Sequence, residues 1–341
     1  MSLTFNIIYT PGTVHYLTFF VRSLLHWSDC SFRLVANGCS AAEESHLRHF
    51  CQQDGRLEFY RLPTDKMIIH GQALNHLHDL TQEDKFCFMD SDIYAIGNFM
   101  SQFLPLGQQH ACVSACSPIW CKPEEQVSSN LHPILAGEYT HTNRGLCLGV
   151  TYFAIYDNVL LTDFRQDTRL GFELRIWEEI SHHHQKRLQK LKLRKAIYDT
   201  GKLLNLMLQG QGHTIVMQEA ETLCHLGGVS DISRIRQNVA QQGQSTPIHR
   251  WQNLSQRIYI RLRRLWQPDY YRFGFSQRRA LYKLYWGEYL GALVEKRRLP
   301  DLPRTGEPEI EARLEVAMQQ IIVLYQQVPH ENLIPGASIL S

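Results

Sequence analysis

Residues 86–97 read FCFMDSDIYAIG. An apolar run of strand length ends on Asp90 and Asp92, and apolar residues resume at once, which is typical of a buried strand that opens into a turn. A carboxylate removed from water must be protonated, paired with a cation or bound to a metal, because burying its bare charge costs several kcal/mol, on the order of 5. The stretch therefore predicts a charged turn at the buried end of a central strand.

A divalent cation is one remedy for two neighbouring carboxylates. Hard oxygen ligands with open coordination positions suit Mn²⁺ or Mg²⁺, and the phosphates of a substrate commonly complete the shell. The alternative is that Asp90 and Asp92 only cap the turn, which is the usual role of an isolated Asp-x-Asp. Other motifs in the chain favour the metal.

Four motifs follow one another in the sequence. A strand and turn occupy residues 5–12, Asp-Ser-Asp occupies 90–92, Asp-Thr-Gly occupies 199–201, and His-Leu-Gly-Gly occupies 225–228. In this order, residues 3–230 resemble the metal-dependent nucleotide-sugar glycosyltransferases of the GT-A fold, similar to families 2 and 8. The resemblance is to the superfamily rather than to one family. It implies an α/β, Rossmann-like, mostly parallel sheet flanked by helices.

The resemblance also implies roles for individual residues. Asp92 is expected as a direct metal ligand, Asp90 as a contact to the ribose and the metal, and His225 as the third protein ligand. Asp199 is expected to act as the base that deprotonates the acceptor hydroxyl in an inverting enzyme, or only to position the acceptor or sugar in a retaining one. Glu219 and Glu221 are reserve candidates for the base.

Donor contacts are expected at the carboxyl ends of the strands, where ligands lie in open α/β sheets. The contacts expected there, some from position and some from the resemblance, are Thr10, Pro11, Gly12, Asn37, Lys66, Asp90, Ser91, Asp92, Gly149, Gly227 and Gly228. Asn37-Gly38 is equally typical of a tight turn, and a lysine such as Lys66 is usually solvated on the surface. A histidine outside such a motif is also more often structural than a ligand.

Periodicity predicts several further elements. We expect a helix over residues 14–27, a strand over 146–156, and a long irregular stretch from 117 to 145, a length typical of functional loops. Asp199 has the sequence context of a helix N-cap, and His225 lies in a glycine-rich stretch that predicts a loop.

Size and composition indicate an ordinary globular protein. The chain has 341 residues, of which 44% are hydrophobic and 20% charged. We expect residues 1–230 to form the nucleotide-sugar-binding catalytic domain and residues 231–341 to form a basic, aromatic-rich, mainly helical C-terminal extension.

The nine cysteines are odd in number and lie mostly in apolar runs, where a thiol behaves as a small hydrophobe. This usage indicates a protein from a reducing compartment. No apolar stretch approaches the roughly 20 residues that span a bilayer, and no signal peptide is evident. The expected location is the cytoplasm, with the inner face of the membrane as an additional site.

The charge is distributed unevenly. Residues 250–304 hold 13 Lys and Arg against 4 Asp and Glu, whereas the whole chain has a formal charge of only +2. This segment is either a peripheral membrane contact for an anionic, lipid-linked acceptor or a solvated, partly core-packed extension. The side chains concerned are Arg257, Arg261, Arg263, Arg264, Arg278, Arg279, Arg297, Arg298, Trp266, Tyr270, Tyr271 and Trp286.

The function expected from these features is transfer of a hexosyl unit from a nucleoside-diphosphate sugar, with UDP as the commonest donor nucleotide, to a glycan, lipid-linked or small-molecule hydroxyl. One rival is a sugar-nucleotide nucleotidyltransferase, which the residues 10–13 disfavour because they lack a run of glycines and any Arg or Lys. A non-catalytic nucleotide-sugar-binding module is a second rival. Nucleic-acid binding is a third, prompted by the basic aromatic segment, and is not expected.

Overall fold

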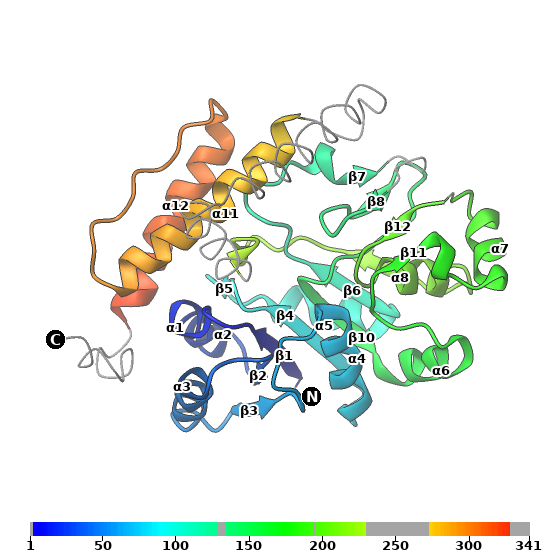
Figure 1. Cartoon of the computed structure of the whole chain (residues 1–341), viewed down its shortest axis with the longest axis horizontal. Coiled ribbons are helices and arrows are strands. Elements are labelled where there is room, and N and C mark those ends of the chain that lie inside the picture. Colours follow the sequence, from blue (N-terminus) through cyan, green and yellow to red (C-terminus); the bar gives the residue numbers. More distant parts are fainter. Residues whose placement is uncertain (1–2, 129–133, 194, 230–272, 328–341) are drawn as a thin grey trace, which may run out of the picture.

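The computed structural model describes residues 3–128, 134–193, 195–229 and 273–327 (Figure 1). Its centre is a seven-stranded sheet in the order β13-β6-β10-β4-β1-β2-β3. Only β10 runs antiparallel to its neighbours, so the predicted mostly parallel α/β sheet is confirmed. These strands are β1 (Thr4–Tyr9), β2 (Ser31–Ala36), β3 (Leu57–Arg61), β4 (Lys85–Asp90), β6 (Cys112–Ala115), β10 (Phe153–Asp157) and β13 (Ile215–Met217).

Helices cover both faces of this sheet, because side chains alternate between the faces along each strand. On β4, Cys87 and Met89 join one apolar core, whereas Phe86 and Phe88 join the other. The first core is closed by α1 (Val14–Leu17), α2 (Phe20–Trp27), α3 (Ala41–Cys51) and α5 (Met100–Gln109). The second is closed by α4 (His70–Leu80), α6 (Asn158–Thr168), α7 (His182–Lys190) and α8 (Lys202–Gln209).

The C-terminal part that the structure describes is helical, as predicted. It consists of α11 (Phe273–Val294) and α12 (Pro308–Gln326), which lie side by side near α1 and α2 (Figure 1). Tyr282, Trp286 and Ile321 are fully buried in the same core as α1–α3. The division of the chain at residue 230 stays a prediction, but these helices and the N-terminal ones bury one continuous apolar core.

Three expected elements differ in the structure. The helix expected over 14–27 is divided into α1 and α2, and the Thr18 hydroxyl donates to the Val14 carbonyl at the junction. The strand expected over 146–156 begins only at Phe153, because Gly149 has a φ of 60°, which a strand does not allow.

The stretch expected to be irregular, 117–145, contains short elements, which are η1 (Pro123–Gln126), β7 (Val127–Ser128), β8 (Ile134–Leu135) and β9 (His141–Thr142). The remaining short elements are β5 (Ile93–Ala95), β11 (Arg175–Ile176), η2 (Trp177–Glu179), β12 (Ile197–Tyr198) and β14 (Leu223–His225).

The nine cysteines are free thiols, and seven of them are buried, in keeping with a role as small hydrophobes. Within the described ranges, no helix combines the length and the apolar character that crossing a bilayer requires.

Candidate metal centre

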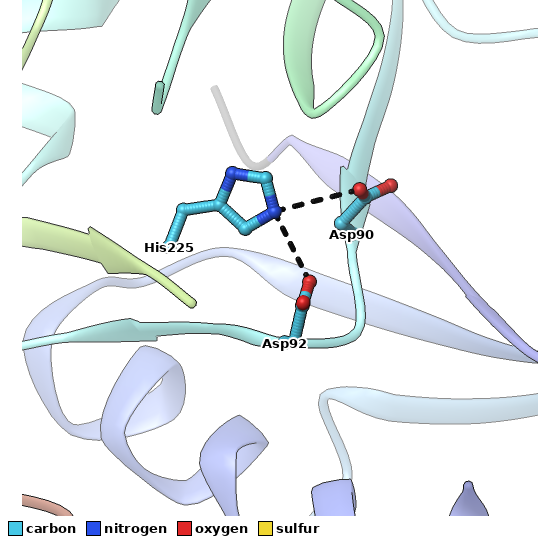
Figure 2. A group of neighbouring side chains, drawn as sticks. All are labelled: Asp90, Asp92 and His225. Carbon is cyan, nitrogen blue, oxygen red and sulfur yellow. Dashed lines mark ion pairs between the residues drawn. The ribbon is translucent and has the colours of Figure 1, made fainter. Parts of the chain in front are cut away.

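The two acids of the central strand and a distant histidine meet at the carboxyl end of β4. Asp90 is the last residue of β4, and Asp92 lies in the turn before β5. Strand β5 pairs antiparallel with β14, with His225 opposite Ile93, and this pairing carries the imidazole to the acids (Figure 2). The sequence prediction of a loop at His225 is therefore wrong, because a three-residue strand holds it. One ligand atom from each of the three residues lies within 4.8 Å of the others.

The imidazole of His225 faces both carboxylates. Its Nε2 atom lies 3.2 Å from Asp92 Oδ1 and 3.6 Å from Asp90 Oδ2. The side chains of His225 and Asp92 are almost completely buried, while that of Asp90 is 23% exposed. The cluster therefore has a closed side, formed by His225 and Asp92, and an accessible side at Asp90.

The hydrogen bonds around the cluster orient the imidazole. His225 Nδ1 lies 2.7 Å from the Cys116 carbonyl oxygen, and only a protonated Nδ1 can donate to this oxygen. The lone pair of the neutral imidazole is then on Nε2, which has no well-aligned hydrogen bond among the described residues. The other oxygen of Asp92 accepts from the Val229 amide at 3.1 Å. A metal-binding histidine usually has this arrangement, with its second nitrogen donating to a carbonyl.

The pKa values show that this cluster retains protons when no cation is bound. The pKa of Asp90 is raised to about 8, mainly by burial and in addition by the charge of Asp92, against the opposing charges of His225 and Lys283. Burial alone would also raise the pKa of Asp92, but His225 and the Val229 amide outweigh it and lower that pKa. For His225, burial lowers the pKa and the two carboxylates more than restore it, so the pKa is raised.

A divalent cation fits these three residues. Two carboxylates and one imidazole are a donor set that suits Mn²⁺ or Mg²⁺, and the buried Nε2 of His225 faces the point where they converge. Since only one side of the cluster is accessible, a bound ion would keep positions open for oxygen ligands of a substrate. The three residues predicted as a metal site are thus brought together, whereas the identity of the ion stays a prediction.

Asp199 lies near this cluster, and Tyr152 lies between them. The rings of Tyr152 and His225 are 4.7 Å apart. A Cβ atom on Gly137 would be 3.2 Å from the Tyr152 hydroxyl and 3.4 Å from Asp199 Oδ2, so both groups face Gly137. One tyrosine ring therefore links the metal ligands to the acid that the sequence singled out as a base.

The carboxylate of Asp199 is not a helix cap. It accepts from the Gly137 and Thr200 amides, both at 2.8 Å, and the N-cap of α8 is Gly201, whose φ of 75° is accessible to glycine at little cost. The N-cap prediction is therefore wrong. His70 lies close enough for the charge of Asp199 to act on it, although burial dominates and lowers the pKa of His70 to about 4.

A buried lysine holds the loop beside Asp199. Lys202 is 1% exposed, and its ammonium donates to the carbonyls of Tyr139 at 2.6 Å, Gly137 at 3.1 Å and Gly149. A side chain on Gly149 would collide with the amide of Asn205, so this glycine is required by packing. Burial lowers the pKa of Lys202 to about 8, against the charges of Asp199 and Glu138.

The predicted donor residues of the first strands lie at the same edge of the sheet. Thr10, Pro11 and Gly12 form the turn after β1, and the Gly12 amide donates to Glu43 at 2.6 Å. Asn37 is 1% exposed, and its amide group both donates to and accepts from the backbone of Ile68 at 2.9 Å. This side chain therefore orders the loop that precedes α4.

The other predicted donor contacts differ in exposure. Lys66 is exposed in the loop before α4, and Ser91 is 5% exposed between the two acids.

Glu219, the reserve candidate for the base, is engaged elsewhere, since its carboxylate accepts from the amide and the hydroxyl of Ser117.

The glycines after His225 pack against side chains that sequence reasoning did not single out. A Cβ on Gly227 would clash with Pro118 and approach the Trp120 indole, and one on Gly228 would collide with the aliphatic stem of Lys283 from α11. Lys283 also lowers the pKa of Asp90, so its positive charge lies close enough to act on that carboxylate. No motif marks Lys283, because it follows His225 by more than fifty residues and belongs to another helix.

Several arginines of the basic segment are neutralised within the protein. Arg278 is buried and pairs with two glutamates, Arg279 pairs with Glu138, and Arg297 pairs with Glu288 and Glu295. Their positive charge is therefore already compensated and favours the core-packed alternative for α11. The residues of this segment before 273, from Arg257 to Tyr271, lie outside the described residues.

Comparisons with known proteins give matches among solved structures alone. The sequence matches no family model and no curated protein. The structure is similar to the glycosyltransferase GlyE of Streptococcus pneumoniae TIGR4, with 11% identity, a TM-score of 0.35, and coverage of 64% of this chain and 46% of GlyE. The chain thus spans about half the length of GlyE.

Two further similar structures belong to proteins described with different activities. One is the mannosyltransferase PcManGT of Pyrobaculum calidifontis in complex with GDP-Man and Mn²⁺, with 12% identity, a TM-score of 0.39, and coverage of 94% of this chain and 84% of that one. The other is a protein described as a glucose-1-phosphate thymidylyltransferase of Bacillus anthracis in complex with a sucrose, with 13% identity, a TM-score of 0.40, and coverage of 66% and 90%. Likenesses at this level leave the family unassigned.

Proposed function

We propose that this protein is a glycosyltransferase that moves a sugar from a nucleoside-diphosphate donor to an acceptor hydroxyl. The observation that carries the proposal is the convergence of Asp90, Asp92 and His225 at the carboxyl end of β4, with Asp199 one tyrosine ring away. A centre for a divalent cation beside a carboxylate that can accept a proton has the chemistry that such a transfer requires.

On the donor side, Asp90, Asp92 and His225 would hold Mn²⁺ or Mg²⁺. When bound, this ion neutralises the diphosphate as a Lewis acid. Lys283 brings a second positive charge close enough to act on Asp90 and is proposed to face the phosphates of a donor. The turn after β1 and the loop ordered by Asn37 lie at the same edge of the sheet and are proposed to contact the nucleotide, for which UDP is our first candidate.

On the acceptor side, Asp199 is proposed to take the proton of the attacking hydroxyl. Its two backbone hydrogen bonds fix the carboxylate, and each carboxylate oxygen keeps a lone pair for a further bond. The Tyr152 hydroxyl faces the same space beside Gly137 and is suited to orient the acceptor or the donor sugar. Inversion at the anomeric carbon follows if Asp199 acts as the base.

The proposal is tested by incubating the purified protein with a panel of nucleotide sugars and candidate glycan and small-molecule acceptors, with Mn²⁺ or with EDTA. We expect acceptor-dependent release of a free nucleoside diphosphate with at least one donor in Mn²⁺ and none in EDTA. Formation of a nucleotide sugar and pyrophosphate from a sugar phosphate and a nucleoside triphosphate would instead establish a nucleotidyltransferase. Binding of nucleotide sugars without turnover across the panel would contradict an enzymatic role.

His225→Ala is expected to weaken Mn²⁺ binding at least about tenfold, because even residues that only support a ligand commonly contribute 10- to 100-fold to metal affinity. The measurement is a Mn²⁺ titration followed by electron paramagnetic resonance, without donor. His183→Ala, an exposed histidine on α7, is the control and should titrate like the parent. Identical titrations of all three proteins would return His225 to a structural role.

Mn²⁺ affinity is expected to rise with pH up to about 8. The cation must displace the protons that Asp90, with its pKa of about 8, and His225, with its raised pKa, retain when no metal is bound. Lowering the pH from 8 to 6 should therefore weaken binding, and binding at pH 7 should release protons. Calorimetry in two buffers of different ionisation enthalpy measures that release. A pH-independent affinity with no proton release would show that the ion binds elsewhere.

A further inference from the structure

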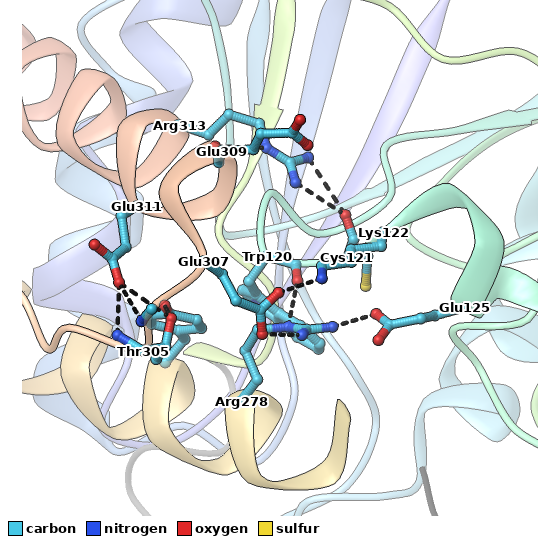
Figure 3. Close-up of polar contacts among 12 residues, drawn as sticks. Trp120, Cys121, Lys122, Glu125, Arg278, Thr305, Glu307, Glu309, Glu311 and Arg313 are labelled. Atoms are coloured by element: carbon cyan, nitrogen blue, oxygen red, sulfur yellow. Dashed lines mark hydrogen bonds and ion pairs between the residues drawn. The ribbon is translucent and has the colours of Figure 1, made fainter. Parts of the chain in front are cut away.

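Helix α11 places a buried arginine against the loop that supports His225. Arg278 is 3% exposed, and its Nε atom donates to the Trp120 carbonyl at 3.0 Å (Figure 3). Its two terminal nitrogens pair with Glu307 at 2.6 Å and with Glu125. One guanidinium thus fastens three parts of the chain, which are the segment 116–121, η1 and the start of α12.

Helix α12 holds the next residue of the same segment. Both terminal nitrogens of Arg313 donate to the Cys121 carbonyl at 3.3 Å, and Lys122 pairs with Glu307 at 2.5 Å. Successive carbonyls, of Trp120 and Cys121, therefore accept from arginines on two different helices (Figure 3). The two helices fix the position of this end of the segment.

Segment 116–121 also contacts His225 and the residue that follows it. The Cys116 carbonyl accepts from the imidazole Nδ1 at 2.7 Å, and the Ile119 amide donates to the His225 carbonyl at 3.0 Å. The Trp120 indole donates to the Leu226 carbonyl at 2.8 Å. The segment therefore determines both the tautomer of the ring and the position of its backbone.

Cys116 adopts a backbone conformation that needs such support. Its φ is 70°, in the left-handed region, which is unfavourable for a residue with a side chain and persists only where the surroundings enforce it. This conformation belongs to the residue whose carbonyl meets His225 Nδ1. A segment released at Trp120 would keep the Ser117–Glu219 contact but lose its hold from the helices, so Cys116 could relax more easily and withdraw that carbonyl from the ring.

We infer that Arg278 is a positioning residue of the metal centre, through which α11 and α12 hold segment 116–121 and thereby fix His225 Nε2 toward Asp90 and Asp92. The inference rests on the proposed role of these three residues as metal ligands. It makes the C-terminal helices part of cation binding, although none of their residues belongs to the ligand cluster.

The test measures Mn²⁺ affinity of the full-length protein without donor, by electron paramagnetic resonance, for the parent, Arg278→Met and Arg278→Lys. We expect Arg278→Met to weaken binding about 10- to 100-fold, the range typical of residues that orient a metal ligand. Arg278→Lys should recover only part of this loss, because one ammonium cannot reproduce the planar three-way contact. Arg297→Met, which removes an exposed arginine whose ion pairs among the described residues are with Glu288 and Glu295, should bind like the parent.

Two measurements separate positioning from general destabilisation. Thermal unfolding establishes that each variant is folded at the titration temperature. Nitrogen-15 NMR of the histidines, without metal and at a pH high enough for the imidazole of His225 to be neutral, should show that His225 loses its single Nδ1-protonated state in Arg278→Met and retains it in Arg297→Met. A folded Arg278→Met with parental affinity and a parental His225 signal would overturn the inference.

If Arg278→Met does not fold, Arg278→Lys and Trp120→Phe carry the test. Trp120→Phe removes the indole hydrogen bond to Leu226 and should also weaken Mn²⁺ binding, whereas parental affinity in both variants would overturn the inference. Absence of Mn²⁺ binding by the parent protein would contradict the metal centre itself. That result would count against the proposed function, and it would be seen before any variant is compared.

Discussion

Asp92→Asn is expected to abolish metal-dependent turnover and to weaken Mn²⁺ binding by more than about 100-fold, beyond the range of residues that only support a ligand. Asp92 is the buried acid of the cluster, and its lowered pKa means that it carries the negative charge closest to His225. Asparagine has nearly the same shape and can still accept from the Val229 amide, but it supplies no charge to offset that of the cation.

The fold should survive this substitution. Removing one of two neighbouring carboxylates relieves part of the repulsion that raises the pKa of Asp90. Circular dichroism and thermal unfolding check the fold, while turnover and Mn²⁺ titration check the function. Asp163→Asn, an exposed acid on α6, is the matched control and should behave like the parent. Full activity of Asp92→Asn, or of the parent in EDTA, would contradict the metal centre.

Asp199→Asn is expected to reduce the transfer rate by a factor on the order of 10² to 10⁴, the usual contribution of a general base. Donor and Mn²⁺ affinities should stay near those of the parent, because Asp199 is neither a proposed donor contact nor a proposed metal ligand. One carboxamide oxygen can replace only one of the two acceptors that now bind Gly137 and Thr200, so a loss of stability of about 1 kcal/mol is expected as well.

Turnover at saturating donor and the anomeric configuration of the product, determined by NMR, are the deciding measurements for Asp199. Glu221→Gln, which changes the other acid expected as a reserve base, is the control, and it should lose little activity because that side chain is exposed. A product that retains the donor's anomeric configuration, or a near-parental rate in Asp199→Asn, would assign this residue to positioning alone.

The sequence was sufficient to predict the central sheet and to predict that Asp90, Asp92 and His225 come together. An apolar run that ends on two acids has a clear local cause, since a buried strand and a polar turn each require their own residue types. The order of the motifs along the chain then indicated His225 as the third residue of the cluster. Its three-residue strand was not predictable, because β14 is defined by pairing with β5 and has too few residues to show a period.

The contribution of the C-terminal helices could not be read from local patterns. Arg278 and Lys283 belong to a run of cations that resembles a solvated or membrane-facing surface, and the acids that compensate Arg278 lie far away, at Glu125 and Glu307. No sequence pattern marks Tyr152 as a site residue, because a tyrosine before an apolar strand is common. Such residues are identified only once the chain has brought them together.

The ammonium of Lys202, held by three carbonyl oxygens, occupies the kind of oxygen cage in which other proteins bind a free potassium or ammonium ion. Here the cation is covalently attached to α8. The loop from Gly137 to Gly149 therefore obtains its central positive charge from the chain itself and needs no ion from solution. The shape of the loop beside Asp199 should consequently be indifferent to the potassium and sodium content of the medium while remaining sensitive to alkali, since the pKa of this lysine is about 8.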